Sequence, residues 1–158
     1  PLSELLHDWA GGPPEGRVIQ AVTMAGLSGG FLAKEGLDIT LDEPSIRAHG
    51  SFLGAGGIMV LDDSRDMVGV AHSAMEFFAH ESCGKCFPCR IGTARLTERL
   101  DSNETSSLEI WREEVDDIGA AMKATSACGL GMAAPLITES LTRWFPEQVE
   151  THVKSADP

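Results

Sequence analysis

The sequence predicts an α+β fold, with a small mixed lobe over residues 1–63 followed by an antiparallel bundle of four helices over residues 64–158. Two observations support this prediction. Before Asp62 the apolar residues form short alternating runs bounded by glycines, which is typical of strands and turns. After Asp66 they recur every three or four positions, a spacing that places them on one face of a helix. We therefore expect the boundary between the lobes to lie between Asp62 and Asp66.

The composition is that of a globular protein with an acidic surface. The chain has 158 residues, of which 42% are apolar, enough for one ordinary domain or two small lobes. Its 24 acidic and 12 basic residues give a formal charge of −12, which disfavours binding to nucleic acid. The sequence shows neither an apolar run long enough to cross a bilayer nor a signal-peptide pattern at its start. We therefore expect a cytoplasmic protein that does not insert into membranes.

In the first lobe the sequence predicts one short helix and three strands. Pro1 suits a helix start, and Gly11 and Gly12 stop the helix. The apolar stripe of this helix consists of Leu2, Leu5, Leu6 and Trp9. The strand candidates cover residues 17–24, 37–42 and 58–63. The glycines of "GAGGIMV" are interpreted as turn residues, because a strand follows them instead of the helix that a dinucleotide-binding loop requires.

The second lobe is expected to contain four amphipathic helices joined by short loops, a pattern typical of an antiparallel bundle. The second of these helices begins around Pro88. The third begins with a capping box of Ser106 and Glu109, and the fourth starts near Pro135. Pro146 should kink or end the fourth helix. The apolar stripes of the four helices are Met67, Val70, Ala71, Ala74, Met75 and Phe78; Cys89, Thr93, Leu96 and Leu100; Leu108, Trp111, Val115, Ile118 and Met122; and Leu136, Ile137, Leu141 and Trp144.

Three of the four cysteines stand with two residues between neighbours, at Cys83, Cys86 and Cys89. The fourth, Cys128, falls in the loop between the third and fourth predicted helices. Four thiolates are the usual ligands of a 4Fe-4S cluster, and short loops allow three closely spaced cysteines to surround one side of it. The "SACGLG" stretch around Cys128 supplies a pliable backbone whose N–H groups can bond to sulfur. The spacing therefore predicts a local clamp that Cys128 completes, so that metal binding and folding are coupled.

The residues around the clamp suit an anionic metal site. Gly84 allows the backbone to curl around sulfur, and Pro88 stiffens the chain before Cys89. Cys89 falls in the first turn of a predicted helix, where free N–H groups favour negative charge. Lys85 and Arg90 add positive charge where thiolates accumulate.

Other uses of the cysteines are less favoured. A structural zinc site of four cysteines usually contains two C-x2-C pairs, whereas here a triplet faces one lone cysteine. Disulfides are unexpected in a chain of this size without a secretion signal. His80 could bind or tune the metal, but an ordinary hydrogen bond at a helix end is favoured. Two functions of different class remain, an electron-transfer module and a non-redox interaction module with a structural zinc site.

The stretches "HESCGKCFPCRIGT" and "TSACGLGMAAP" resemble the C-terminal part of the NADH-oxidising flavoprotein subunits. This family includes the flavoprotein subunit of respiratory complex I, the diaphorase subunit of NAD-reducing hydrogenases and the β subunit of NAD-dependent formate dehydrogenases. The stretches "AGGPPEGRVIQAVTMAGLSGGFL" and "GSFLGAGGIMVLDD" are similar to the family's β-grasp (SLBB-like) domain. The resemblance covers residues 1–150, and the Gly-Leu-Gly after the last cysteine is closer to the hydrogenase and formate dehydrogenase branches.

The resemblance implies a β-grasp lobe and a four-helix bundle whose 4Fe-4S cluster has four ligands, namely Cys83, Cys86, Cys89 and Cys128. The cluster takes electrons from FMN after hydride transfer from NADH. It passes them to partner subunits, a thioredoxin-like 2Fe-2S subunit and a larger iron-sulfur or catalytic subunit. The N-terminal domain that binds FMN and NAD(H) in the family is missing here, and the β-grasp lobe is expected to be incomplete at its N-terminus. We therefore expect part of an oxidoreductase subunit that has no catalytic residue of its own and does not oxidise NADH alone.

Overall fold

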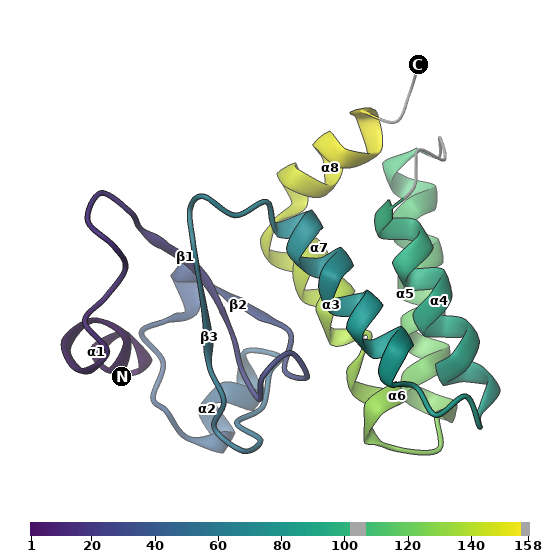
Figure 1. The fold of residues 1–158 in the computed structure, drawn as a ribbon, viewed down its shortest axis with the longest axis horizontal. Coiled ribbons are helices and arrows are strands. Elements are labelled where there is room, and N and C mark those ends of the chain that lie inside the picture. The colour runs from purple at the N-terminus through teal and green to yellow at the C-terminus, as the bar shows by residue number, and fades with distance from the viewer. Residues whose placement is uncertain (102–106, 156–158) are drawn as a thin grey trace. The chain divides into compact units, whose positions relative to one another are not determined.

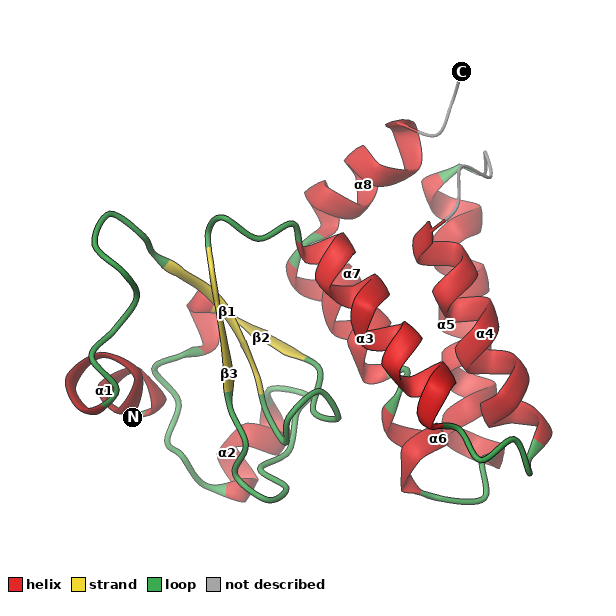
Figure 2. Cartoon of the chain, in the orientation of Figure 1, coloured by secondary structure: helices red, strands yellow, loops and turns green. Residues whose placement is uncertain are grey.

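A computed structural model describes residues 1–101 and 107–155 of the chain. The chain divides into two compact units, Pro1–Arg65 and Asp66–Pro158. The first unit contains a three-stranded sheet with short helices, and the described part of the second unit contains helices (Figures 1 and 2). The predicted α+β class is therefore confirmed.

The sheet of the first unit is arranged around its central strand. β1 (Ile19–Thr23) pairs antiparallel with β2 (Phe31–Ala33) on one side and with β3 (Met59–Asp62) on the other. The last three residues of β1 are fully buried, so this strand lies in the middle of the core. The core of the first unit consists of Leu2, Leu6, Ile19, Val22, Met24, Leu32, Leu37, Ile39 and Ile46.

β1 and β3 correspond to the strands predicted over residues 17–24 and 58–63. The sequence does not predict β2, because three residues are too few to show an alternating pattern. Gly54 and Gly56 have φ angles of 54° and 81°, as the turn interpretation of these glycines requires.

The strand predicted over residues 37–42 does not form. The carbonyl oxygen of Ile39 accepts the N–H of Leu2 at 2.8 Å. The carbonyl oxygen of Leu37 accepts the N–H of Ser3 at the same distance of 2.8 Å. These carbonyl groups therefore hold the start of the N-terminal helix instead of pairing with a strand. The elements on either side are the 3-10 helix η2 (Lys34–Gly36) and the helix α2 (Glu43–Ala48).

The predicted N-terminal helix is present, but it changes from an α-helix to a π-helix along its length. One α-helical turn, α1 (Leu2–Glu4), continues as a π-helix, η1 (Leu5–Trp9). Leu2 and Leu6 are buried as predicted, whereas Trp9 is 76% exposed. In a π-helix each N–H bonds to the carbonyl five residues back, so Trp9 leaves the stripe that the α-helical period predicts.

Six helices make up the described part of the second unit. They are α3 (Met67–Glu81), α4 (Phe87–Asp101), α5 (Leu108–Thr125), α6 (Gly129–Ala133), α7 (Leu136–Trp144) and α8 (Pro146–Ser155). α3 packs against α4 and α7, and α5 packs against the same two helices (Figure 1). These four helices correspond to the four predicted ones, while α6 and α8 are additional. None of the helices in the described residues is both long and apolar enough to cross a membrane.

The predicted apolar stripes of these helices are buried to different depths. The residues with little or no exposure are Met67, Ala71, Ala74, Met75, Phe78, Cys89, Thr93, Leu96, Leu100, Trp111, Val115, Met122, Ile137 and Leu141. The half-buried ones are Val70, Leu108, Ile118, Leu136 and Trp144. Ser107 caps α5 by accepting the N–H of Ile110 at 3.3 Å. The capping residue predicted for this helix, Ser106, lies outside the described residues.

Pro146 separates two helices. α7 ends at Trp144, as the proline predicts, but the chain turns at Phe145 and α8 begins at Pro146 itself. A proline in the first helical position removes no hydrogen bond, so it can start a helix as well as end one.

Candidate metal centre

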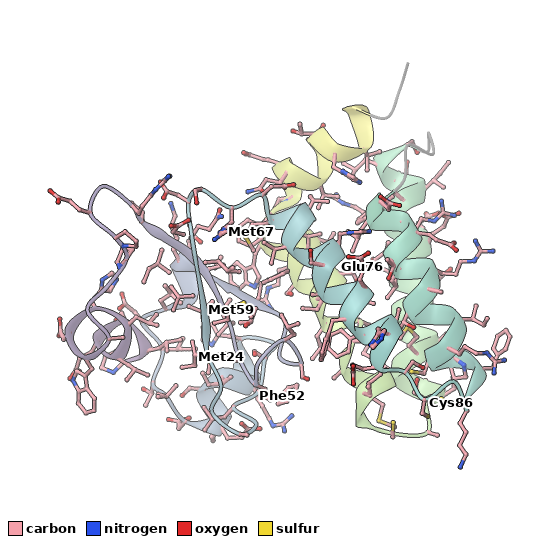
Figure 3. The ribbon with its side chains drawn as sticks, viewed as in Figure 1. Met24, Phe52, Met59, Met67, Glu76 and Cys86 are labelled. Carbon is pink, nitrogen blue, oxygen red and sulfur yellow. The ribbon has the colours of Figure 1, made fainter. Side chains whose placement is uncertain are left out.

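The cysteine clamp lies in the connection between α3 and α4. α3 ends at Glu81, and Ser82 leaves the helix with an extended backbone. Cys83 and Cys86 lie in the loop that follows, where Figure 3 labels Cys86. Cys89 lies in the first turn of α4. Exposure falls along the clamp, because Cys83 is exposed, Cys86 is half-buried and Cys89 is 5% exposed.

Hydrogen bonds hold the loop of the clamp in a tight curl. Gly84 has a φ of 72°, a left-handed conformation that glycine adopts readily. Its N–H donates to the Ser82 hydroxyl at 3.3 Å, and its carbonyl accepts from Nη1 of Arg90 at 2.7 Å. The backbone N–H of Arg90 donates to the carbonyl of Cys86 at 3.1 Å. Arg90, predicted as a source of positive charge, therefore also fixes the shape of the loop.

Cys128 approaches the clamp from the connection between α5 and α6. It is exposed and immediately precedes the first residue of α6. α6 packs against both α4 and α5. Figure 1 shows α6 at the end of these helices where the loop between α3 and α4 also lies. The fold therefore brings the two cysteine-bearing connections to the same end of the second unit.

A hydrogen bond from backbone to sulfur joins the two connections. The N–H of Ala127 donates to the sulfur of Cys86, and the N–H of Cys89 donates to the same sulfur. Both bonds favour the thiolate, so they lower the pKa of Cys86 below that of an ordinary cysteine. The residue before Cys128 is thus in direct contact with the clamp.

Cys89 lies at the buried side of the site. Burial raises the pKa of Cys89, and the negative charges of the other three cysteines raise it further. The hydroxyl of Ser82, 3.3 Å from the Cys89 sulfur, acts in the opposite direction and lowers this pKa. The charges of the other three cysteines all act on Cys89, so Cys83, Cys86 and Cys128 lie near enough to influence its pKa.

Next to Cys89 the structure leaves a polar atom without a partner. Ser126, at the end of α5, is 5% exposed, and its hydroxyl has no hydrogen-bond partner among the described residues. Leaving such a group unpaired in a protein interior costs about 1–3 kcal/mol. A Cβ atom at Gly131 of α6 would overlap this hydroxyl and would lie 2.8 Å from the Cβ of Cys89. The site therefore fits a bound group that offers acceptors to Ser126.

The donor set also fits an iron-sulfur cluster. Four thiolates, together with backbone N–H groups and hydroxyl groups directed at sulfur, are the groups that bind and tune such clusters. Within residues 1–101 and 107–155, no group of three or more His, Cys, Asp or Glu side chains is placed to hold one metal ion. A cluster of four irons is a larger body than one ion, so its ligands surround a wider space.

Comparison with protein families identifies the second unit. The family described as the NADH-ubiquinone oxidoreductase-F iron-sulfur binding region matches residues 69–152, a range that contains all four cysteines. The chain belongs to this family. The resemblance of the sequence to NADH-linked oxidoreductase subunits is thereby confirmed.

Relatives of this oxidoreductase-F iron-sulfur region include a hydrogenase subunit and NADH-quinone oxidoreductase subunits. NADP-reducing hydrogenase subunit HndC of Solidesulfovibrio fructosivorans is 38% identical over 96% of this chain and 31% of its own length. A subunit of the NADH-quinone oxidoreductase of Rhizobium meliloti (strain 1021) is 34% identical over 97% of this chain and 37% of its own length. The chain therefore spans about a third of the length of these curated relatives.

A solved structure of similar fold is the NAD⁺-reducing NiFe hydrogenase in its H2-reduced state. The match has a TM-score of 0.74 and a sequence identity of 31%. It covers 85% of this chain and 23% of the hydrogenase chain. The air-oxidised state of the same hydrogenase gives the same values, a TM-score of 0.74 and 31% identity.

Three further polar residues lie next to the cysteines of this iron-sulfur region in the sequence, namely His80, Ser82 and Ser126. Nδ1 of the exposed His80 lies 3.1 Å from a carboxylate oxygen of Glu81, as the hydrogen-bond interpretation of this histidine predicts. Ser82 and Ser126, by contrast, lie beside the cysteines and are not predicted from the sequence. The available signal is their position, directly before Cys83 and two residues before Cys128. Spacing does not distinguish a hydroxyl directed at sulfur from one directed at solvent.

Proposed function

We propose that the four cysteines Cys83, Cys86, Cys89 and Cys128 ligate one 4Fe-4S cluster, through which the chain transfers single electrons. The observation that carries this proposal is the close approach of α6, the helix that follows Cys128, to the buried Cys89 of the clamp. The description of the family as an iron-sulfur binding region supports it. A cluster held by four protein thiolates supplies one-electron transfer and leaves no iron position open for a substrate.

The two sides of the site have different tasks in this proposal. Cys89 holds the buried side, where the packing of α6 against α4 excludes water. Cys83 and Cys128 hold the exposed side, where a redox partner can approach. The two N–H groups directed at Cys86 stabilise its thiolate form. Arg90 keeps the loop of the clamp curled through its bond to a backbone carbonyl.

The chain would be one part of a larger NADH-linked oxidoreductase subunit. Its relatives are named as subunits of an NADP-reducing hydrogenase and of NADH-quinone oxidoreductases. Because a nicotinamide donates a two-electron hydride and a cluster accepts one electron, a flavin must stand between them. FMN and NAD(H) would bind to an N-terminal domain of the same subunit. The partners would be a thioredoxin-like 2Fe-2S subunit and a larger iron-sulfur or catalytic subunit, in the cytoplasm.

The finer fold assignment belongs to the same proposal. Residues 1–63 would form an incomplete β-grasp (SLBB-like) lobe, supported by its three-stranded antiparallel sheet packed with short helices. Residues 64–158 would form a four-helix bundle, supported by the packing of α3 and α5 against both α4 and α7. The loops at one end of this bundle would carry the cluster.

Metal analysis of the chain purified without oxygen tests the proposal. We expect a brown protein with about four irons and about four labile sulfides per chain, because four thiolates match the cuboidal cluster. Stoichiometric zinc without labile sulfide would favour the alternative function instead, an interaction module with a structural zinc site.

A further inference from the structure

Two serine hydroxyls lie beside Cys89, the buried member of the clamp. The hydroxyl of Ser82, at the end of α3, is 3.3 Å from the Cys89 sulfur. The hydroxyl of Ser126, at the end of α5, lies near the same cysteine, because one Cβ atom at Gly131 would touch both residues. Cys89 of α4 therefore has a hydroxyl from one helix end at its sulfur and a hydroxyl from another helix end close to its side chain.

The bonds of Ser82 leave its hydroxyl proton free to be donated to Cys89. Its oxygen accepts the N–H of Gly84 at 3.3 Å, which leaves the hydroxyl proton available for another acceptor. A cysteine that ligates iron carries no proton. In the loaded site, Ser82 is therefore the donor in the 3.3 Å contact with Cys89.

Ser126 differs from Ser82 because its hydroxyl proton has no acceptor among the described residues. Its hydroxyl is buried and lacks a partner among the described residues. Gly131 keeps the space beside this hydroxyl free, because any side chain at that position would overlap Ser126. A buried hydroxyl is normally hydrogen-bonded, so a group bound beside Cys89 is the expected acceptor.

We infer that Ser82 and Ser126 donate hydrogen bonds to sulfur atoms at the buried side of the cluster and thereby raise its reduction potential. The inference rests on the proposed function. Reduction adds one negative charge to the site, and donors directed at sulfur stabilise that charge. Their effect is large at the buried side, where water is excluded and the local dielectric constant is low. Neither serine is a ligand: Ser82 would act through the sulfur of Cys89, which it contacts, and Ser126 through a sulfur atom of the bound cluster.

A redox titration of the cluster-loaded chain, followed by electron paramagnetic resonance, tests this inference. Ser82→Ala and Ser126→Ala should each shift the midpoint potential to a more negative value, and the double variant should shift it further. Ser82→Thr keeps the hydroxyl and should restore most of the wild-type potential. Ser73→Ala, which changes an exposed serine of α3, should leave the potential unchanged.

The outcomes separate this inference from the proposed function. Equal iron content and equal potentials in wild type, Ser82→Ala and Ser126→Ala would overturn the inference and leave the cluster assignment standing. A wild-type chain without iron and sulfide would overturn both. If Ser82→Ala loses its iron, Ser82→Gly provides a second chain without the hydroxyl. Loss of iron from both, with retention in Ser82→Thr, would support a bond from the hydroxyl to the cluster.

Discussion

The backbone N–H of Ala127 donates a hydrogen bond to the sulfur of Cys86, although the two residues belong to different connections between helices. The bond holds the loop before Cys128 against the middle of the clamp. Because its donor is a backbone group, a change of side chain at position 127 to any residue other than proline keeps the donor of this bond. The fold thus fixes the approach of the remote cysteine through the main chain, and the thiol of Cys128 remains available for metal.

Gly131→Ala should damage the candidate site directly. The added methyl group would overlap the Ser126 hydroxyl and approach the Cβ of Cys89 within 2.8 Å. Overpacking of this kind costs about 1–3 kcal/mol. We expect a lower melting temperature and a lower iron content per chain, measured by thermal unfolding and by metal analysis.

Gly129→Ala is the matched control for this change, because it places the same methyl group in the same short helix. A Cβ atom at Gly129 meets nothing within 4 Å. This variant should keep the iron content and the melting temperature of the wild type. Equal damage from both substitutions would show that α6 responds to lost flexibility and not to the close approach at Cys89.

Trp111 should stabilise the second unit through packing and through one hydrogen bond. It is 2% exposed, and its indole N–H donates to the carbonyl of Arg99 at 2.9 Å. Trp111→Phe keeps most of the packing and should lose about 1 kcal/mol of unfolding free energy. Trp111→Ala should lose about 3–5 kcal/mol. Denaturant unfolding measures both values, and the change of the exposed Ile110 to alanine should stay within about 0.5 kcal/mol of wild type.

The sequence predicts the helices of the second unit well and the first unit less well. Met67, Met75 and Phe78 recur at helical spacing because one face of α3 is buried over its whole length. By contrast, the apolar residues Leu37 and Ile39 alternate as in a strand but serve as anchors for the N-terminal helix. Such an exchange of backbone partners depends on contacts between distant segments, which local periodicity does not report.

For the candidate site, spacing predicts the cysteines but not the groups that surround them. The pattern of Cys83, Cys86 and Cys89 is local, so a short motif carries it. The hydroxyl of Ser126 and the N–H of Ala127 reach the clamp only because α6 packs against α4. This packing in turn needs glycine at position 131, where a side chain would overlap Ser126. Nothing in the local sequence distinguishes Gly131 from Gly129, which has open space around it.

NADH should not reduce the cluster-loaded chain in the absence of a flavin. The chain should accept single electrons, whereas a nicotinamide donates a hydride, which requires a flavin as the intermediate carrier. Dithionite should bleach the visible absorption and produce a paramagnetic reduced state, and NADH should leave the spectrum unchanged. Adding a domain that binds FMN and NADH should make NADH effective. Rapid reduction by NADH without flavin would contradict this account of the electron path.

The central claim, that two distant segments hold one cluster, is tested most directly by measuring iron and labile sulfide in Cys128→Ala beside Ala127→Ser. Ala127→Ser keeps the backbone N–H that bonds to Cys86, and its exposed side chain has room for a hydroxyl. We predict about four irons and about four sulfides per chain for wild type and Ala127→Ser, with a clear loss of both from Cys128→Ala. Equal iron, equal sulfide and an equal melting temperature in Cys128→Ala and wild type would contradict the claim.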